Sequence, residues 1–80
     1  MAPSVDQLRK EYNLFSEDAK KYKSANFIFD LEDADSTYLR LLIKRDEKYL
    51  EILKIENHIR IPVVKHRLNR YRQLLSEVMV

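Results

Sequence analysis

The sequence predicts an all-α fold, and three observations support this prediction. The chain of 80 residues contains no glycine, which compact β architectures use in tight turns that need a positive φ. Apolar residues recur at spacings of three and four in two long stretches, as they do on one face of a helix. Hydrophobic residues make up 45% and charged residues 35% of the chain, a balance typical of amphipathic helices rather than disorder. We therefore expect one domain over residues 1–80, with two or three amphipathic helices in a hairpin or bundle.

The first helix is expected from about residue 5 to residue 23. Ser4, followed three residues later by Gln7, has the form of a capping box. The apolar positions that follow have the heptad spacing of a coiled-coil seam, and they are Val5, Leu8, Tyr12, Phe15, Ala19 and Tyr22. A second capping signal at Ser16 leaves a break near residues 13–16 open.

Residues 24–36 are expected to connect the first two helices. They include the apolar stretch Phe27-Ile28-Phe29. Because a single strand without a partner is unstable in water, we expect the aromatic side chains to cover the helix ends as a hydrophobic plug. Four acids follow at positions 30, 32, 33 and 35, and they favour the positive end of the next helix. The expected capping residue is one of Asp35, Ser36 and Thr37.

This acidic segment does not have the spacing of a calcium loop. Counted from Asp30, the sixth residue is Asp35, where glycine should form the sharp turn, and the twelfth is Leu41, where a bidentate glutamate is needed. The stretch 27–32 resembles the opening of the haloacid-dehalogenase phosphatase motif. The Gly-Thr that completes that motif is missing, and the chain is too short for that family's α/β domain. We therefore interpret the acids as the N-terminal residues of a helix.

The second helix is expected over about residues 37–60 and the third over about residues 63–79. The middle of the second, from Lys44 to Lys48, is polar all round, so we expect it either to bridge through solvent or to lie under no partner. Pro62 predicts a kink or a tight elbow at residues 61–62, because proline suits a first helical turn and disrupts a helix interior. The third helix carries a second heptad seam, formed by Val64, Leu68, Tyr71, Leu75 and Val78.

The two seams carry the expected packing. A chain this short buries a modest share of its surface, so we expect self-association or a partner protein to complete the fold. The expected interface residues are Val5, Leu8, Tyr12, Phe15, Val64, Leu68, Tyr71, Leu75 and Val78. The five tyrosines of the chain fall mostly on or beside the seams, which suits the edge of a core.

The last stretch of the chain, residues 58–80, is strongly basic. Only Glu77 opposes its five cationic residues, which are Arg60, Lys65, Arg67, Arg70 and Arg72. Arginine makes bidentate contacts to phosphates and to carboxylates, so two interpretations stay open. One is a helix that contacts nucleic-acid phosphates. The other is pairing with acids on a neighbouring helix, such as Glu11, Glu17, Glu51 or Glu56.

No residue pattern predicts catalysis or metal binding. The chain has no cysteine, and His58 and His66 lack the partners of a zinc site. We therefore expect a non-enzymatic protein–protein interaction or assembly module, a homo-oligomer or a subunit of a larger complex. The alternative is a nucleic-acid-binding protein that uses the basic helix Arg60–Arg72. Neither function needs a cofactor or a small-molecule substrate.

The expected location is intracellular, either cytoplasmic or nuclear. No apolar run approaches the roughly 20 residues of a membrane-spanning helix, and we expect no membrane partner. The first residues, Met1 to Asp6, lack the basic and apolar regions of a signal peptide.

Overall fold

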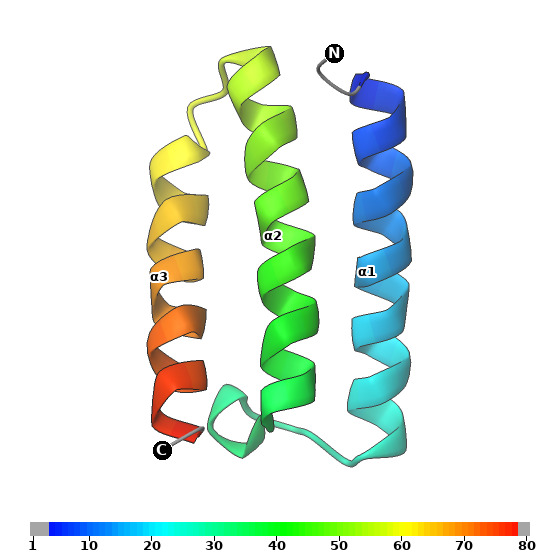
Figure 1. The fold of residues 1–80 in the computed structure, drawn as a ribbon, viewed down its shortest axis with the longest axis vertical. Helices are drawn as coiled ribbons and strands as arrows, with labels where there is room; N and C mark the ends of the chain where they lie inside the picture. Colours follow the sequence, from blue (N-terminus) through cyan, green and yellow to red (C-terminus); the bar gives the residue numbers. More distant parts are fainter. Residues whose placement is uncertain (1–3, 79–80) are drawn as a thin grey trace.

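The computed structural model of the chain describes residues 4–78. Three long helices follow one another: α1 (Val5–Ala25), α2 (Ser36–Glu56) and α3 (Ile61–Val78), with a short 3-10 helix, η1 (Leu31–Asp33), between the first two. Figure 1 shows the long helices side by side, each running opposite to the one before it, with α2 in the middle. No strand occurs among residues 4–78. The predicted all-α bundle is therefore confirmed, in its three-helix form.

The helix α2 is the centre of the fold, because α1 and α3 both pack against it. Within the described part of the chain, no Cα atom of α1 comes within 8 Å of a Cα atom of α3. Seven side chains of α2 are buried, compared with two in α1 and three in α3. Within residues 4–78, both outer helices therefore pack against α2 and not against each other.

One continuous core runs between the three helices. It joins residues of α1, α2, α3 and the α1–α2 connection, and the least exposed of them are Leu39, Leu53, Val64, Leu68 and Ala19. Each fully buried leucine or valine of this core stabilises the fold by about 1.5–3 kcal/mol. The core thus holds both outer helices in place through contacts with α2.

The helix α1 is continuous over the region where the sequence left a break open. The Ser4 hydroxyl accepts a hydrogen bond from the backbone N–H of Gln7 at 3.2 Å, as the capping box predicts. The helix then runs through Ser16 without interruption to Ala25. It is two residues longer than expected.

The α1–α2 connection begins with a Schellman motif that contains no glycine. The backbone N–H of Ile28 donates to the carbonyl oxygen of Lys23 at 3.0 Å, and that of Phe27 donates to Ser24 at 3.4 Å. This motif needs a residue in the left-handed region, and Phe27 adopts φ 54°. The chain then passes through η1 to Asp35, whose carboxylate accepts the backbone N–H of Tyr38 at 2.9 Å and caps α2.

The second connection corrects the predicted helix boundaries. The helix α2 ends at Glu56 instead of continuing to residue 60, and residues 57–60 form a turn instead of a kink at 61–62. Asn57 adopts φ 53° and ψ 49°, and the backbone N–H of His58 donates to Leu53 at 3.0 Å. Asparagine tolerates the left-handed region better than most residues, so it ends the helix as glycine would. Pro62 lies in the first turn of α3, where proline is favoured.

No helix of the described residues has both the length and the apolar character that crossing a membrane requires.

Candidate interaction surfaces

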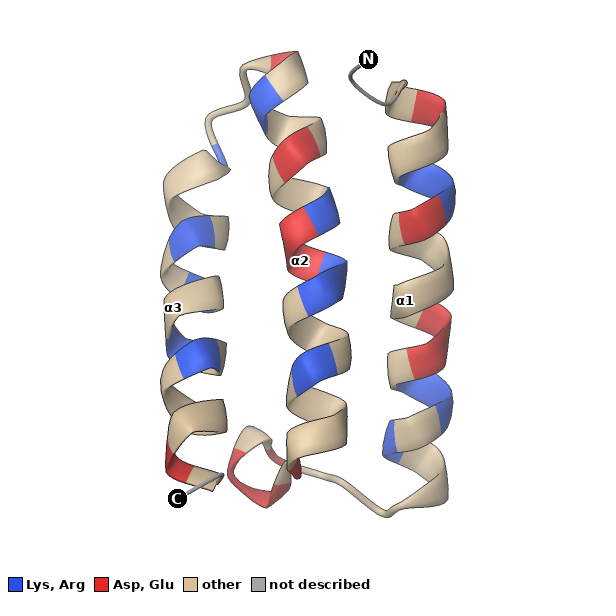
Figure 2. Ribbon diagram, in the orientation of Figure 1, with Lys and Arg blue, Asp and Glu red and all other residues tan. Residues whose placement is uncertain are grey.

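The charge pattern of α3 differs from that of the other two helices. Figure 2 shows acidic and basic bands together on α1 and α2, whereas α3 carries only basic bands until its last turn. The five cations singled out from the sequence do not share one environment. Arg67 is half-buried, and the other four are exposed: Arg60, Lys65, Arg70 and Arg72.

Arg67 binds Asp46, a fully buried carboxylate in the middle of α2. Arg67 donates from Nε to Oδ2 at 2.7 Å and from Nη2 to Oδ1 at 3.1 Å, which is the bidentate geometry of a strong arginine–carboxylate pair. Arg45 also donates from Nε to Oδ1 at 3.0 Å. Among the described side chains, no buried polar atom is left without a hydrogen bond. The Arg45–Asp46–Arg67 cluster therefore joins α2 to α3 through a satisfied polar contact inside the core.

This cluster overturns the expectation that the middle of α2 lies under no partner. Lys44 and Glu47 are exposed, but Asp46 is 0% exposed. The reason is its position: Asp46 follows Leu39 and Leu42 at spacings of three and four, so it lies on the buried face of α2. That spacing is visible in the sequence, and the polar type of residue 46 concealed it.

Three of the four acids that were expected to pair with the basic helix lie beside other cations, and Glu17 has no ion pair within residues 4–78. Glu11 accepts an ion pair from Lys48 at 3.1 Å, and Glu51 lies 3.8 Å from the same ammonium. Glu56 pairs with Arg9 at 2.5 Å. Arg67 does pair with an acid on a neighbouring helix, but that acid is Asp46.

The other four cations are exposed. Arg60, in the turn before α3, donates from Nη1 to the Tyr49 hydroxyl oxygen at 3.4 Å. Lys65, Arg70 and Arg72 are exposed and have no ion pair within residues 4–78. Three unpaired cations are therefore available on the outside of α3.

Both heptad seams pack against α2 within the same chain. On α1, Leu8 and Ala19 are 1% and 3% exposed. On α3, Val64, Leu68 and Tyr71 are buried. The partly buried seam residues are Val5, Tyr12, Phe15, Tyr22 and Leu75, and Val78, at the end of α3, is half exposed. The seams thus form the interior of one chain and leave little surface for a second.

Tyr12, Tyr22 and Tyr49 are partly buried, as expected at the edge of the core, whereas Tyr38 and Tyr71 are buried within it. The rings of Tyr12 and Tyr49 lie 5.3 Å apart, and Tyr22 stacks on Tyr38 at 6.4 Å. The Tyr22 hydroxyl donates a hydrogen bond to Asp35 Oδ2. This bond lowers the pKa of the Asp35 carboxyl and raises the pKa of the Tyr22 hydroxyl. It ties the end of α1 to the start of α2.

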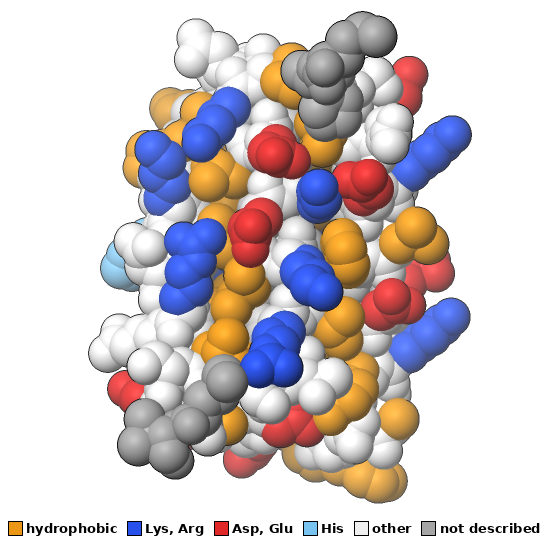
Figure 3. All heavy atoms as spheres, viewed as in Figure 1, with side chains coloured by type: hydrophobic (Ala, Val, Ile, Leu, Met, Phe, Trp, Pro, Cys, Tyr) orange, Lys and Arg blue, Asp and Glu red, His pale blue; other side chains and the backbone are white. Residues whose placement is uncertain are grey.

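The aromatic residues of the α1–α2 connection do not form the expected plug. Phe27 and Phe29 are 76% and 77% exposed, whereas Ile28 between them is 5% exposed. Ile28 thus enters the core, while Phe27, with its left-handed backbone, and Phe29 both present their rings to solvent. We call Phe27 and Phe29 the aromatic pair. Figure 3 shows apolar side chains on the surface at this end of the molecule, below α1.

A second exposed apolar group lies at the opposite end of the bundle. It surrounds the turn between α2 and α3 and consists of Ile55, Ile59 and Val63, of which Ile59 is almost fully exposed. Figure 3 shows apolar side chains near the upper end of α3 as well. Both ends of the bundle therefore present apolar side chains to solvent.

The two histidines lie outside any metal-binding group of the described residues. His58 Nδ1 accepts the backbone N–H of Arg60 at 3.1 Å, and His66 is exposed on α3. Across residues 4–78, no group of three or more His, Cys, Asp or Glu side chains is placed to hold a metal ion.

The surface offers three features to other molecules: the aromatic pair, the apolar group at the α2–α3 turn, and the unpaired cations of α3. No protein-family model matches the chain, and comparisons with curated proteins and with solved structures give no match either.

Proposed function

We propose that this chain is a non-enzymatic protein–protein interaction module, which joins an assembly through its aromatic pair. The observation that carries this proposal is the state of Phe27. Its side chain is 76% exposed, and its backbone adopts φ 54°. A large apolar residue is thus held in a left-handed conformation and presented to water.

Neither folding nor packing accounts for phenylalanine at this position. The left-handed region costs an L-residue about 1–2 kcal/mol, which glycine avoids. The exposed ring of Phe27 gains little from burial in return. Backbone outliers of this kind are found at binding sites, where the surrounding structure holds them in place, and phenylalanine is enriched in protein–protein interfaces.

The connection that carries the aromatic pair is held in place by the residue between the two phenylalanines. Ile28 is buried between Phe27 and Phe29, and its backbone N–H is bonded to Lys23 at 3.0 Å. A connection fixed in this way loses little freedom when a partner covers it, which favours binding.

The packing of the seams limits where a partner protein could bind. Because Leu8 and Leu68 are already buried against other parts of the chain, association through the seams would require the bundle to open. We therefore assign association, either with a second copy or with another protein, to the aromatic pair.

The test compares three variants in sedimentation velocity and in capture from cell extract. Phe27→Gly and Phe29→Ser remove the aromatic pair, and Leu14→Ser is the control, because Leu14 is also exposed (63%) but lies in the middle of α1. We expect the first two to abolish self-association or the capture of a specific partner, and the control to retain it. Association that survives Phe27→Gly and Phe29→Ser would refute the proposal.

A second candidate function is nucleic-acid binding by α3. The supporting observation is that Lys65, Arg70 and Arg72 are exposed without ion pairs in the described structure. Three phosphate contacts give a slope of log K against log salt of at most about −3.

A salt titration with duplex and single-stranded DNA tests this candidate. If it holds, Arg70→Gln should reduce the slope by about one, while Lys20→Gln on α1 should leave it unchanged. No binding at low salt would eliminate it.

A further inference from the structure

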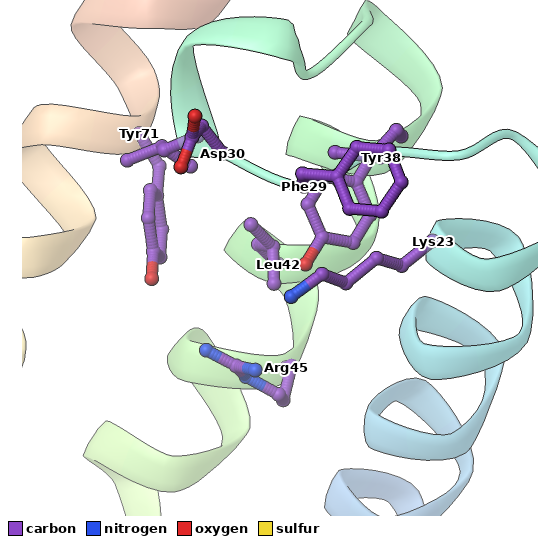
Figure 4. Close-up of a pocket in the computed structure, with 9 residues that line it drawn as sticks. Lys23, Phe29, Asp30, Tyr38, Leu42, Arg45 and Tyr71 are labelled. Atoms are coloured by element: carbon purple, nitrogen blue, oxygen red, sulfur yellow. The ribbon is translucent and has the colours of Figure 1, made fainter.

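A cavity of about 230 Å³ lies beside the α1–α2 connection. Figure 4 shows side chains from α1, α2, α3 and the connection around it. Ile28 and Leu42 belong to its apolar wall, and Lys23, Arg45 and Tyr71 belong to its polar wall. The cavity is therefore apolar on one side and able to donate hydrogen bonds on the other.

The polar wall carries positive charge that the fold does not neutralise. Asp46 has a single negative charge, and Arg67 already binds both of its carboxylate oxygens, at 2.7 and 3.1 Å. Arg45 contributes a second positive charge through one bond from Nε, and its side chain is 21% exposed. Burial opposes the charged form of Arg45, but the hydrogen bond and charge of Asp46 raise the pKa of the guanidinium, so it stays charged. Because Arg67 shares the same carboxylate, the three side chains carry one net positive charge that can attract an anion.

Lys23 and Tyr71 face the same cavity. In Figure 4 the Lys23 ammonium, the Arg45 guanidinium and the Tyr71 hydroxyl approach the cavity from three different helices. Burial raises the pKa of the Tyr71 hydroxyl, and the Asp46 charge adds to this effect. The hydroxyl is therefore protonated at neutral pH and can donate a hydrogen bond.

We propose that this cavity binds a small organic anion, a carboxylate with a short apolar group, whose charge meets Lys23, Arg45 and Tyr71. The apolar group lies against Ile28 and Leu42. Asp30, the acid of the lining, leaves an excess of one positive charge between Lys23 and Arg45, which favours a monoanion. The volume is below the range of about 300–1,000 Å³ typical of drug-sized ligands, so the ligand is small.

The cavity shares Phe29 with the aromatic pair, but anion binding is tested on the isolated chain, so its result does not depend on a docking partner. The probe is benzoate, followed by two-dimensional ¹H–¹⁵N NMR of the full chain, and benzyl alcohol is the uncharged probe of similar size. We expect saturable shifts confined to residues around the cavity with benzoate, weaker binding at high salt, and much weaker binding of benzyl alcohol.

Two variants test the residues assigned to the anion. Lys23→Gln removes a charge from an exposed position, and Tyr71→Phe removes a hydroxyl while keeping the buried ring. Each should weaken benzoate binding by at least about threefold, the scale of one partly exposed polar contact. Lys20→Gln, on the same helix as Lys23 and outside the lining, should leave the affinity unchanged.

Three results would overturn the inference. Benzyl alcohol could bind as tightly as benzoate, which would show an apolar cavity without anion selectivity. The shifts could be scattered over the surface or fail to saturate. The two lining variants could bind benzoate as well as the Lys20→Gln control does.

Discussion

Replacing Arg67 by methionine tests how much the Arg45–Asp46–Arg67 cluster contributes to stability. Methionine keeps an unbranched stem that can pack along α3 and removes only the guanidinium. The change leaves Asp46, which is 0% exposed, with one remaining bond, from Arg45 Nε at 3.0 Å. Two hydrogen bonds, at 2.7 and 3.1 Å, are lost.

The expected loss follows from the burial of the three side chains. Removing one partner of a fully buried ion pair costs about 3–5 kcal/mol. Here the Arg67 side chain is 38% exposed, so water already weakens the pair, and Arg45 retains its contact to the carboxylate. We therefore expect Arg67→Met to lower the free energy of unfolding by about 2–4 kcal/mol, a large share of the roughly 4–12 kcal/mol typical of a domain this size.

Urea unfolding followed by far-UV circular dichroism measures this loss. Arg70→Met is the matched control, because Arg70 is exposed on the same helix and has no ion pair in the described structure; it should change stability by less than about 0.5 kcal/mol. The double variant Asp46→Leu/Arg67→Met should regain stability relative to Arg67→Met, since it removes the uncompensated carboxylate. Equal effects of Arg67→Met and Arg70→Met would refute this reasoning.

Three further predictions concern the caps and the core. Because the hydrogen bond from Tyr22 lowers the pKa of Asp35, its stabilising effect is complete above the usual carboxyl range and is lost as the pH falls through the lowered pKa. Tyr22→Phe should therefore be less stable than wild type at neutral pH, by a margin that shrinks below about pH 4 in urea titrations at a series of pH values. Asn57→Ala should be less stable than Asn57→Gly by about 1 kcal/mol in the same assay, because alanine is strained at φ 53°; equal stabilities would contradict the assigned left-handed cap. Leu68→Ala should cost about 2–5 kcal/mol, because Leu68 is 1% exposed, and a loss below 1 kcal/mol would show that this seam is not packed as described.

The helices and their buried faces could be predicted because their signals are local. The spacing of Leu8 and Ala19 in α1, and of Val64, Leu68 and Tyr71 in α3, identified residues that the structure buries. Ser4 supplied its cap by hydrogen-bonding three residues ahead. In each case the pattern and the contact lie within one helix, so the sequence is sufficient to find them.

The partner of each face could not be predicted in the same way. The seams suited either a bundle within the chain or a second chain, and within this chain both lie against α2, which has buried side chains of its own. The buried position of Asp46 was not predicted, because its polar type suggested solvent although its spacing placed it on the buried face. Its pairing with Arg67 depends on α3 lying beside α2, which no local pattern shows.

The two changes of direction were expected, but the backbone conformation that produces them was not. The chain has no glycine, the usual residue at a positive φ, yet Phe27 and Asn57 both adopt the left-handed region. Asparagine tolerates the left-handed region, so the residue type at Asn57 was a usable signal for a helix end. Phenylalanine does not, so no residue type indicates the left-handed conformation of Phe27, which belongs to the proposed interaction surface.

The central claim is that the two seams close within a single chain around α2. The most direct test is the urea midpoint of the wild-type protein, measured over a hundredfold or wider range of protein concentration. A chain that completes its own core should unfold at a midpoint independent of concentration, even where the folded molecules associate weakly through the aromatic pair. A midpoint that rises steadily with concentration would show that folding requires a second chain, and it would contradict this account.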